Sequence, residues 1–304
     1  MKLDKIIDNM LESYNKYPDI SKIDTVLQPD KEIILKILSR LQNIVFPGFF
    51  GRKDLSQQSA KYYLGDQLQI IYDDLKNQIY LALAYGEKYE GISEKEKEEL
   101  SEKITLEFLS RLPMIRDFLA TDAEATFDGD PAAFSKSEIV FSYPGYYAIT
   151  VNRLAHELYL LEVPLIPRIM TEYAHGLTGI DIHPGATMGK YLMIDHGTGI
   201  VIGETTTIGE HVKIYQGVTL GALSTQGGQN LKNVKRHPTI EDNVTIYSNA
   251  SILGGETVIG EGSTIGGNTF ITKSVPAGTI VNNKAEQRFK QSQKYQDFGH
   301  GQFI

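Results

Sequence analysis

The last third of the chain repeats in units of six residues. Between residues 180 and 275, an aliphatic residue stands at every sixth position within successive runs, and a small or β-branched residue often follows four positions later. The aliphatic positions are Ile182, Met188, Ile194 and Ile200; Ile202, Ile208, Ile214 and Leu220; Ile240, Ile246 and Ile252; and Ile259, Ile265 and Ile271. A period of six matches neither the roughly 3.6 residues of an amphipathic helix nor the period of about two of a half-buried strand. It predicts a left-handed parallel β-helix, in which three short strands build one triangular coil.

Each coil of such a β-helix uses three hexads, or about 18 residues, and its aliphatic side chains stack on those of the next coil. A sandwich of short strands would share the richness in Ile, Val and Gly. The hexad phase persists over about a dozen repeats, which a sandwich does not require. The β-helix is therefore the better interpretation.

The chain before the repeats has helical patterning up to about residue 175. Apolar residues recur at i, i+3 and i+4 spacing, as they do at Leu64, Leu68, Ile71, Leu75 and Ile79. Residues 121–143 contain the turn sequence Asp128-Gly129-Asp130-Pro131, and we expect a loop there. The fold class is therefore α+β, with an N-terminal α-helical domain over residues 1–177 and a β-helix over residues 178–280. Residues 281–304 are polar and predict a flexible C-terminal tail.

Bulk composition excludes several classes of function. The 304 residues carry a formal net charge of −8, which argues against binding nucleic acid through phosphate contacts. Without any Cys, the chain has no disulfide, no thiolate nucleophile and no zinc–thiolate site. The N-terminus has no apolar signal core, and no run approaches the length of a membrane span. We expect a cytoplasmic protein that does not enter a membrane.

The hexad count is interrupted in two places. The larger interruption lies between Leu220 and Ile240, where a long insertion replaces the normal step of six. The inserted segment, residues 222–235, is polar, and a loop that leaves a rigid scaffold is often functional. A smaller slip of two residues falls between Ile200 and Ile202.

Histidines and carboxylates gather around these interruptions. The simplest chemistry they offer is a histidine that acts as general base on a bound hydroxyl. Asp181 and His196 are separated by close to one coil, so they could stack and hydrogen bond; Glu204 could serve His237 in the same way. His183 precedes Pro184 and reads as a turn or surface residue. The three histidines offer no closely spaced pair, so we expect no metal site.

At these residues the chain resembles the serine O-acetyltransferase family. The matching segments run in family order: Gly179-Ile180-Asp181-Ile182-His183-Pro184, Ile194-Asp195-His196-Gly197-Thr198-Gly199-Ile200-Val201-Ile202-Gly203-Glu204-Thr205, Val218-Thr219-Leu220-Gly221 and Lys235-Arg236-His237-Pro238. The resemblance covers roughly residues 90–280 and includes Asp130-Pro131-Ala132 upstream. It implies transfer of acetyl from the cosubstrate acetyl-CoA to the L-serine hydroxyl, giving O-acetyl-L-serine for cysteine biosynthesis, without a metal.

The resemblance also implies a role for each matching residue. His196 would be the general base and Asp181 its partner, with His237 and Glu204 on the other side of the serine. Asp130 and Asp195 would bind the serine ammonium, and Arg236 its carboxylate, which agrees with the charges of an amino acid. The implied CoA contacts, made largely by main chain, are Gly221, Ala222, Ser248, Asn249, Ala250, Gly266 and Lys273.

Partners follow from the same resemblance. Family members are trimers through the β-helix and often hexamers through N-terminal helices, and L-cysteine is the implied feedback inhibitor. A C-terminal Ile of the family can enter the active site of O-acetylserine sulfhydrylase, and this chain ends in Ile304. The chain departs from the family in its longer loop before Arg236 and in Lys235, which stands where the family has Asp.

Three alternatives remain open at this stage. A hexapeptide acetyltransferase for another hydroxyl acceptor, such as a sugar or an antibiotic, would share His196 but would not need Asp130, Asp195 and Arg236 together. A non-catalytic β-helix scaffold would need neither the carboxylate–histidine pairs nor the ejected loop. A γ-type carbonic anhydrase would need bound zinc.

Overall fold

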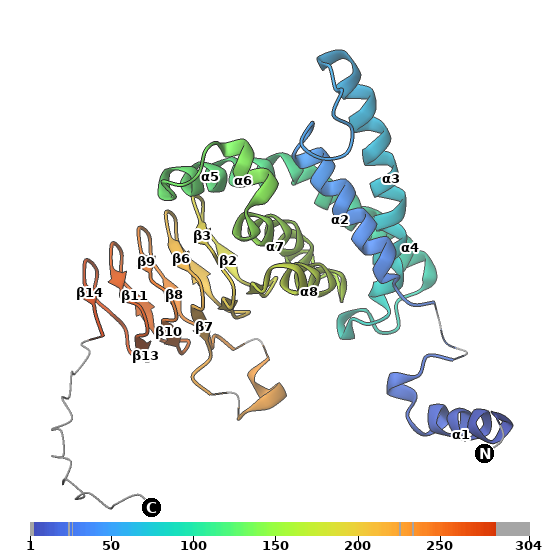
Figure 1. Ribbon diagram of the computed structural model, residues 1–304. Coiled ribbons are helices and arrows are strands. Elements are labelled where there is room, and N and C mark those ends of the chain that lie inside the picture. Colours follow the sequence, from blue (N-terminus) through green and yellow to red (C-terminus); the bar gives the residue numbers. More distant parts are fainter. Residues whose placement is uncertain (1–2, 24, 26, 225, 233, 284–304) are drawn as a thin grey trace, which may run out of the picture.

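A computed structural model shows a helical region followed by a parallel β-helix of about five turns (Figure 1). The structure describes residues 3–283 except 24, 26, 225 and 233. Most of the predicted tail, with Ile304, lies outside the described residues. Within the described residues, no helix is both long and apolar enough to cross a membrane.

Eight α-helices precede the β-helix in the described part of the chain. They are α1 (Leu3–Lys16), α2 (Lys31–Val45), α3 (Gln57–Leu83), α4 (Glu94–Ser110), α5 (Leu112–Gly129), α6 (Lys136–Ser142), α7 (Pro144–Leu160) and α8 (Ile166–Thr178). Several begin at side-chain caps. Ser56 and Ser93 form capping boxes at α3 and α4, and the Asp30 side chain accepts two backbone amides at the start of α2.

The prediction of a loop over residues 121–143 is wrong at both ends of that range, because α5 continues to Gly129 and α6 begins at Lys136. The last turns of α5 lack a clear apolar stripe because two of their buried residues, Asp122 and Thr126, are polar. Both are hydrogen bonded, Asp122 to Arg153 and Thr126 to a backbone carbonyl one turn earlier. The turn chemistry applies only to the short connection between the helices.

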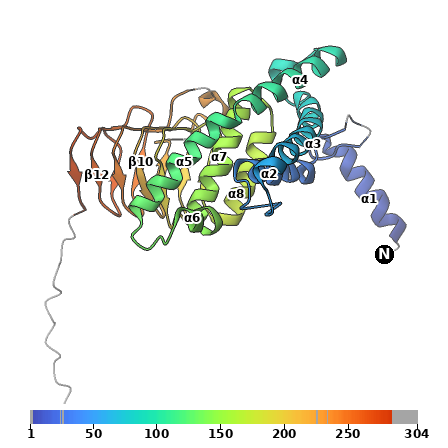
Figure 2. The same cartoon turned by 90° about the horizontal axis from the view of Figure 1, so that it is seen from above.

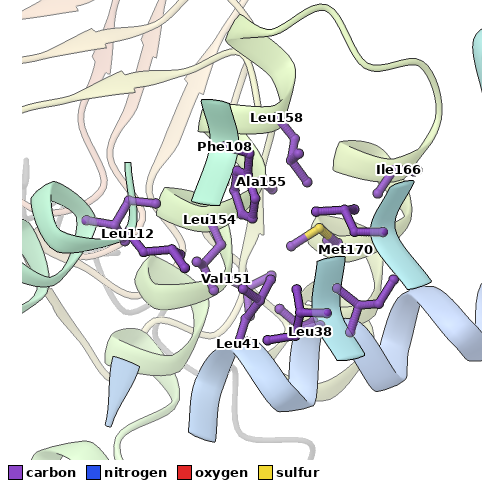
Figure 3. Packing of buried hydrophobic residues seen from close by; sticks show 14 of the residues in the cluster. Leu38, Leu41, Phe108, Leu112, Val151, Leu154, Ala155, Leu158, Ile166 and Met170 are labelled. Carbon is purple, nitrogen blue, oxygen red and sulfur yellow. The ribbon is translucent and has the colours of Figure 1, made fainter. Parts of the chain in front are cut away.

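Helices α2, α3, α4, α5, α7 and α8 enclose one apolar core. Figure 3 shows Leu38 and Leu41 of α2 near Val151 of α7, with Met170 of α8 in the same cluster. Helix α1 lies apart from this body (Figures 1 and 2) and has no buried residue.

The β-helix consists of fourteen short strands in the described region. They are β1 (Asp181–Ile182), β2 (Thr187–Met188), β3 (Met193–Asp195), β4 (Val201–Ile202), β5 (Thr207–Ile208), β6 (Lys213–Tyr215), β7 (Thr219–Gly221), β8 (Thr239–Ile240), β9 (Thr245–Ile246), β10 (Ser251–Leu253), β11 (Val258–Ile259), β12 (Thr264–Ile265), β13 (Phe270–Ile271) and β14 (Ile280–Val281). They form three parallel sheets: β1-β4-β7-β10-β13 (the first), β2-β5-β8-β11 (the second) and β3-β6-β9-β12-β14 (the third).

Strand register confirms the hexad prediction and both of its interruptions. Asp181 pairs with Val201 and Val201 with Thr219, so the first coil is two residues longer than the second. This excess is the predicted slip. Thr219 pairs in turn with Ser251, and the third coil therefore carries the whole inserted segment 222–235. The predicted aliphatic positions form the buried interior of the prism.

Two corners of the prism carry the polar residues of interest. The His196 corner is where the chain passes from the third sheet to the first, between β3 and β4 and at the equivalent places of later coils. The Arg236 corner is where it passes from the first sheet to the second, between β4 and β5 and again between β7 and β8. The inserted loop leaves the prism at the Arg236 corner (Figure 1).

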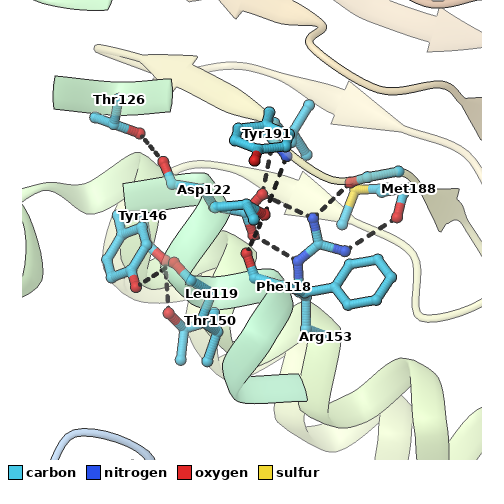
Figure 4. Close-up of polar contacts among 12 residues, drawn as sticks. Phe118, Leu119, Asp122, Thr126, Tyr146, Thr150, Arg153, Met188 and Tyr191 are labelled. Atoms are coloured by element: carbon cyan, nitrogen blue, oxygen red, sulfur yellow. Dashed lines mark hydrogen bonds and ion pairs between the residues drawn. The ribbon is translucent and has the colours of Figure 1, made fainter. Parts of the chain in front are cut away.

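A buried ion pair joins the helical region to the first coil (Figure 4). Arg153 of α7 binds Asp122 of α5 through two hydrogen bonds of 2.6 and 2.9 Å, and its guanidinium also donates to the Met188 and Gly189 carbonyls. Asp122 in turn accepts the backbone amide of Leu192, which precedes β3. Since both side chains are buried, this clamp fixes α5 and α7 against the β-helix.

Candidate active site

The predicted general base stands on an open corner. His196 follows β3, has a left-handed backbone conformation (φ 55°), and its side chain is 70% exposed. The wide turn continues through Gly197 and Gly199, both with positive φ, and contains the two extra residues of the first coil. The neighbouring carboxylate of Asp195 has its Oδ1 at 3.6 Å from Nδ1 of His196. A base at this position is accessible to a hydroxyl group.

A second carboxylate reaches this corner from the helical region. Asp130 follows α5 directly, and its Oδ2 accepts a 2.6 Å hydrogen bond from the Tyr143 hydroxyl. That hydrogen bond lowers the pKa of Asp130, with help from the Ala132 amide and the nearby charge of His196. The same bond raises the pKa of Tyr143 to about 12, and Asp195 adds to the rise. Asp130 and Asp195 thus form an anionic cluster next to His196, which suits a cationic amine.

Asp181 lies on β1 and is half-buried. Among the described residues, its carboxylate makes no hydrogen bond to His196. In the strand register Asp181 pairs with Val201, whereas His196 lies in the corner that precedes β4. Asp181 instead lies near Glu172 and His175 at the end of α8. The Asp181–His196 dyad stays a prediction.

Glu204 and Arg236 form an ion pair at the other corner. Tyr159 of α7 also donates to Glu204, over 3.0 Å, and Arg236 donates to the Leu231 carbonyl of the inserted loop, over 3.2 Å. Arg236 and Tyr159 keep the pKa of Glu204 low although partial burial opposes this. The predicted pairing of Glu204 with His237 is not formed, because Arg236 and Tyr159 are its hydrogen-bond partners.

His237 is buried next to this ion pair. Its Nδ1 accepts the Thr205 amide over 3.1 Å and lies 2.9 Å from the Thr205 hydroxyl oxygen, so the ring proton belongs on Nε2. Burial, with the positive charge of Arg236 beside it, lowers the pKa of His237 to about 4. The imidazole is therefore neutral at physiological pH. Thr205 Oγ1 also accepts the Arg236 and His237 amides and so sets the backbone there.

His183 belongs to this corner too and is more than a surface residue. Its ring packs edge-on against Tyr159, and its Nδ1 accepts the Gly185 amide over 3.0 Å. Burial lowers its pKa. Lys235, the departure from the family pattern, donates to the Thr205 carbonyl over 2.6 Å and so fastens the base of the loop.

The residues expected to contact CoA divide between the two corners. Ser248, Asn249, Ala250 and Gly266 continue the His196 corner on later coils, whereas Gly221, Ala222 and Lys273 continue the Arg236 corner. The Ala250 side chain is buried inside the prism, so only its backbone can face a ligand. Lys273 is exposed.

Sequence reasoning missed three residues that hold the predicted ones in place: Tyr143, Tyr159 and Thr205. The tyrosines lie on the helical side, outside any repeat, so the hexad count gave no signal for them. Thr205 lies in a matching segment next to Glu204, and its proximity to the slip was an available signal. Each acts by a hydrogen bond to a residue that is 13 or more positions away in the sequence.

The two corners therefore offer complementary chemistry. One presents an exposed imidazole beside two carboxylates, which suits a general base and an amine ligand. The other presents a guanidinium, already paired with Glu204, beside a neutral imidazole, and so offers a cation for a carboxylate ligand and a hydrogen-bond donor. Glycines and small residues along both corners let a ligand approach the backbone.

Comparison with known proteins identifies relatives with this fold. No family model matches the chain. A serine acetyltransferase from a plasmid of Synechococcus elongatus is 47% identical over 260 residues, which cover 84% of this chain and 81% of that protein. Serine acetyltransferase isoform 3 of Entamoeba histolytica, solved with cysteine, has a TM-score of 0.71 at 33% identity. The matched region covers 95% of this chain and 96% of that protein's chain. A serine acetyltransferase solved with CoA has a TM-score of 0.52 at 25% identity, and the match covers 83% of this chain and 96% of that protein's chain. The sequence identity and the shared architecture together show that the chain belongs to the serine acetyltransferase family.

Proposed function

We propose that the protein transfers the acetyl group of acetyl-CoA to the hydroxyl of L-serine and releases O-acetyl-L-serine and CoA. The observation that carries this proposal is the division of charge in the site. The anionic cluster lies beside the proposed base and the guanidinium lies at the other corner, and one amino acid needs both, for its ammonium and for its carboxylate. A sugar acceptor has no use for this arrangement.

In the proposed mechanism, His196 removes the serine hydroxyl proton while the oxygen attacks the thioester carbonyl. The tetrahedral oxyanion is stabilised by backbone N–H donors and collapses, breaking the carbon–sulfur bond. The CoA thiolate takes back the proton from His196, which returns the base to its starting state. Asp181 would orient the imidazole and stabilise its charged form.

We infer that each site is shared between two copies in a trimer. The His196 and Arg236 corners are separated by a strand of the first sheet, and at about 3.3 Å per residue a hexad is far longer than serine. In a cyclic assembly, one corner of each copy meets the other corner of the next copy. The exposure of His196 supports this arrangement, because a neighbour would cover it and exclude water. The division of the expected CoA residues between the same corners supports it as well.

L-Cysteine is the proposed inhibitor, because it carries the same ammonium and carboxylate as serine, and a relative was solved with cysteine. Cysteine would bind to Asp130 and Asp195 through its ammonium and to Arg236 through its carboxylate, and it would compete with serine. Binding of the C-terminal Ile304 to O-acetylserine sulfhydrylase also remains a proposal, and it is tested by binding of a peptide of residues 295–304.

The reaction is tested by serine-dependent loss of the acetyl-CoA thioester, with and without L-cysteine. His196→Ala should lower turnover by about 10²–10⁴-fold, because one positioned base contributes that much. Its affinity for CoA should be unchanged, since the base does not bind the donor. Near-native turnover in His196→Ala, or equal rates with a sugar acceptor, would overturn the proposal.

A further inference from the structure

Three potential metal ligands meet where the helical region joins the β-helix. One ligand atom each from Glu172, His175 and Asp181 lies within 4.8 Å of the other two. Glu172 and His175 are three positions apart on α8 and therefore share a face of its last turn. Gly179 ends the helix with φ 71° and turns the chain, so that Asp181 on β1 comes back toward that face. Because one short segment, residues 172–181, supplies all three groups, the arrangement is formed locally by the fold.

In the described part of the chain, one of the three groups has no side-chain partner, and the other two share a hydrogen bond that a bound ion would replace. Arg168 holds Oε1 of Glu172 at 2.5 Å, while Oε2 faces Nδ1 of His175 at 3.3 Å. The arginine thus orients the carboxylate from behind, as partners outside the coordination sphere do in metal sites. Among the described residues, the Asp181 carboxylate has no hydrogen bond or ion pair that would compete. All three side chains are at least partly exposed, so an ion can enter and water can complete its coordination.

We propose that Glu172, His175 and Asp181 bind a divalent transition metal ion, Zn²⁺, and that this ion inhibits acetyl transfer. One imidazole and two carboxylates match the ligand preference of Zn²⁺ and balance its charge, and three protein ligands plus water are a common coordination. Mg²⁺ is a poor fit, because it avoids imidazole and prefers to keep its own waters.

The inhibition rests on the proposed function, in which Asp181 orients His196. A carboxylate bound to Zn²⁺ cannot also accept a hydrogen bond from the imidazolium at full strength, so the general base loses its partner. The bound ion would therefore lower turnover while leaving the serine ligands Asp130 and Arg236 in place.

Binding is tested on the full-length protein by competition for Zn²⁺ with a chromophoric chelator and by the absorption spectrum of Co²⁺ as a substitute ion. The wild type should bind one ion per chain, and His175→Gln should weaken binding by more than the roughly 10–100-fold that loss of a partner outside the coordination sphere causes. His211→Gln, which removes an exposed histidine elsewhere, is the matched control and should bind like the wild type. Equal binding by His175→Gln and the wild type would overturn the site, as would binding that Mg²⁺ displaces.

Inhibition is measured separately from initial rates of thioester loss. Zn²⁺ should reduce the turnover of the wild type and of His211→Gln but not that of His175→Gln, whose turnover without metal should be normal. Stoichiometric binding with unchanged turnover would overturn the inhibitory role. Absence of serine-dependent activity before any metal is added would instead contradict the proposed function, and the binding result would still stand.

Discussion

The ion pair between Asp122 and Arg153 should be the most costly single contact to remove from the junction. Asp122→Ala deletes two hydrogen bonds to the guanidinium and the acceptor for the Leu192 amide. It leaves the charge of Arg153, whose side chain is only 7% exposed, without a counterion. Removing one partner of a buried pair costs about 3–5 kcal/mol, and we expect a loss of that size in the free energy of unfolding. Because α5 leads directly to Asp130, KM for serine should rise as well.

The loss is measured by urea unfolding at fixed protein concentration, since assembly stabilises the folded chain in a concentration-dependent way. Two variants serve as controls. Asp122→Leu combined with Arg153→Met replaces the pair with apolar groups and should be more stable than Asp122→Ala. Lys95→Met breaks an exposed pair with Glu99 and should cost less than about 0.5 kcal/mol. A cost below about 1 kcal/mol for Asp122→Ala would refute the reasoning, and so would a double variant less stable than Asp122→Ala.

Further predictions concern the Arg236 corner. A Cβ at Gly203 would lie 2.1 Å from the His237 ring, so Gly203→Ala should displace that ring and reduce activity, whereas Gly65→Ala, with open space around it, should not. The free energy of unfolding should fall as the pH drops from about 6.5 to 4. In that range the unfolded chain binds a proton that buried His237 in the folded chain, with its pKa of about 4, does not. A His237→Asn variant whose stability changes with pH as steeply as that of the wild type would contradict this. Glu87→Gln removes the exposed partner of Lys232, so limited proteolysis should cut the inserted loop faster while global stability stays within about 0.5 kcal/mol; unchanged cleavage would show that this contact does not hold the loop.

The hexad pattern was sufficient to predict the β-helix and the two places where its coils lengthen, because each inward position demands an aliphatic side chain. It could not predict side-chain partners at the corners. Asp181 and His196 were expected to stack, but Asp181 pairs with Val201 and His196 lies in the corner before β4, so the dyad stays a prediction. Glu204 was expected to pair with His237, but the neighbouring Arg236 offers a charge and competes more strongly.

The helical side of the site was harder to predict for a related reason. Asp122 and Thr126 are buried polar residues, and they made the end of α5 look like a loop. Tyr143 and Tyr159 reach the site only because α7 packs against the first coil, and a period of six contains no information on that packing. The roles assigned to the site residues remain predictions that the variants above can test.

The central claim is that one active site is completed by two copies of the chain. It is tested most directly by co-expressing His196→Ala and Arg236→Ala with different tags and assaying the mixed trimers. Each variant alone should be nearly inactive. In a random equal mixture, about one interface in four joins an intact His196 corner to an intact Arg236 corner, so about a quarter of wild-type activity should return. If each chain instead carries a complete site, every chain in the mixture holds one defect, and activity that stays at the level of the separate variants would contradict the account.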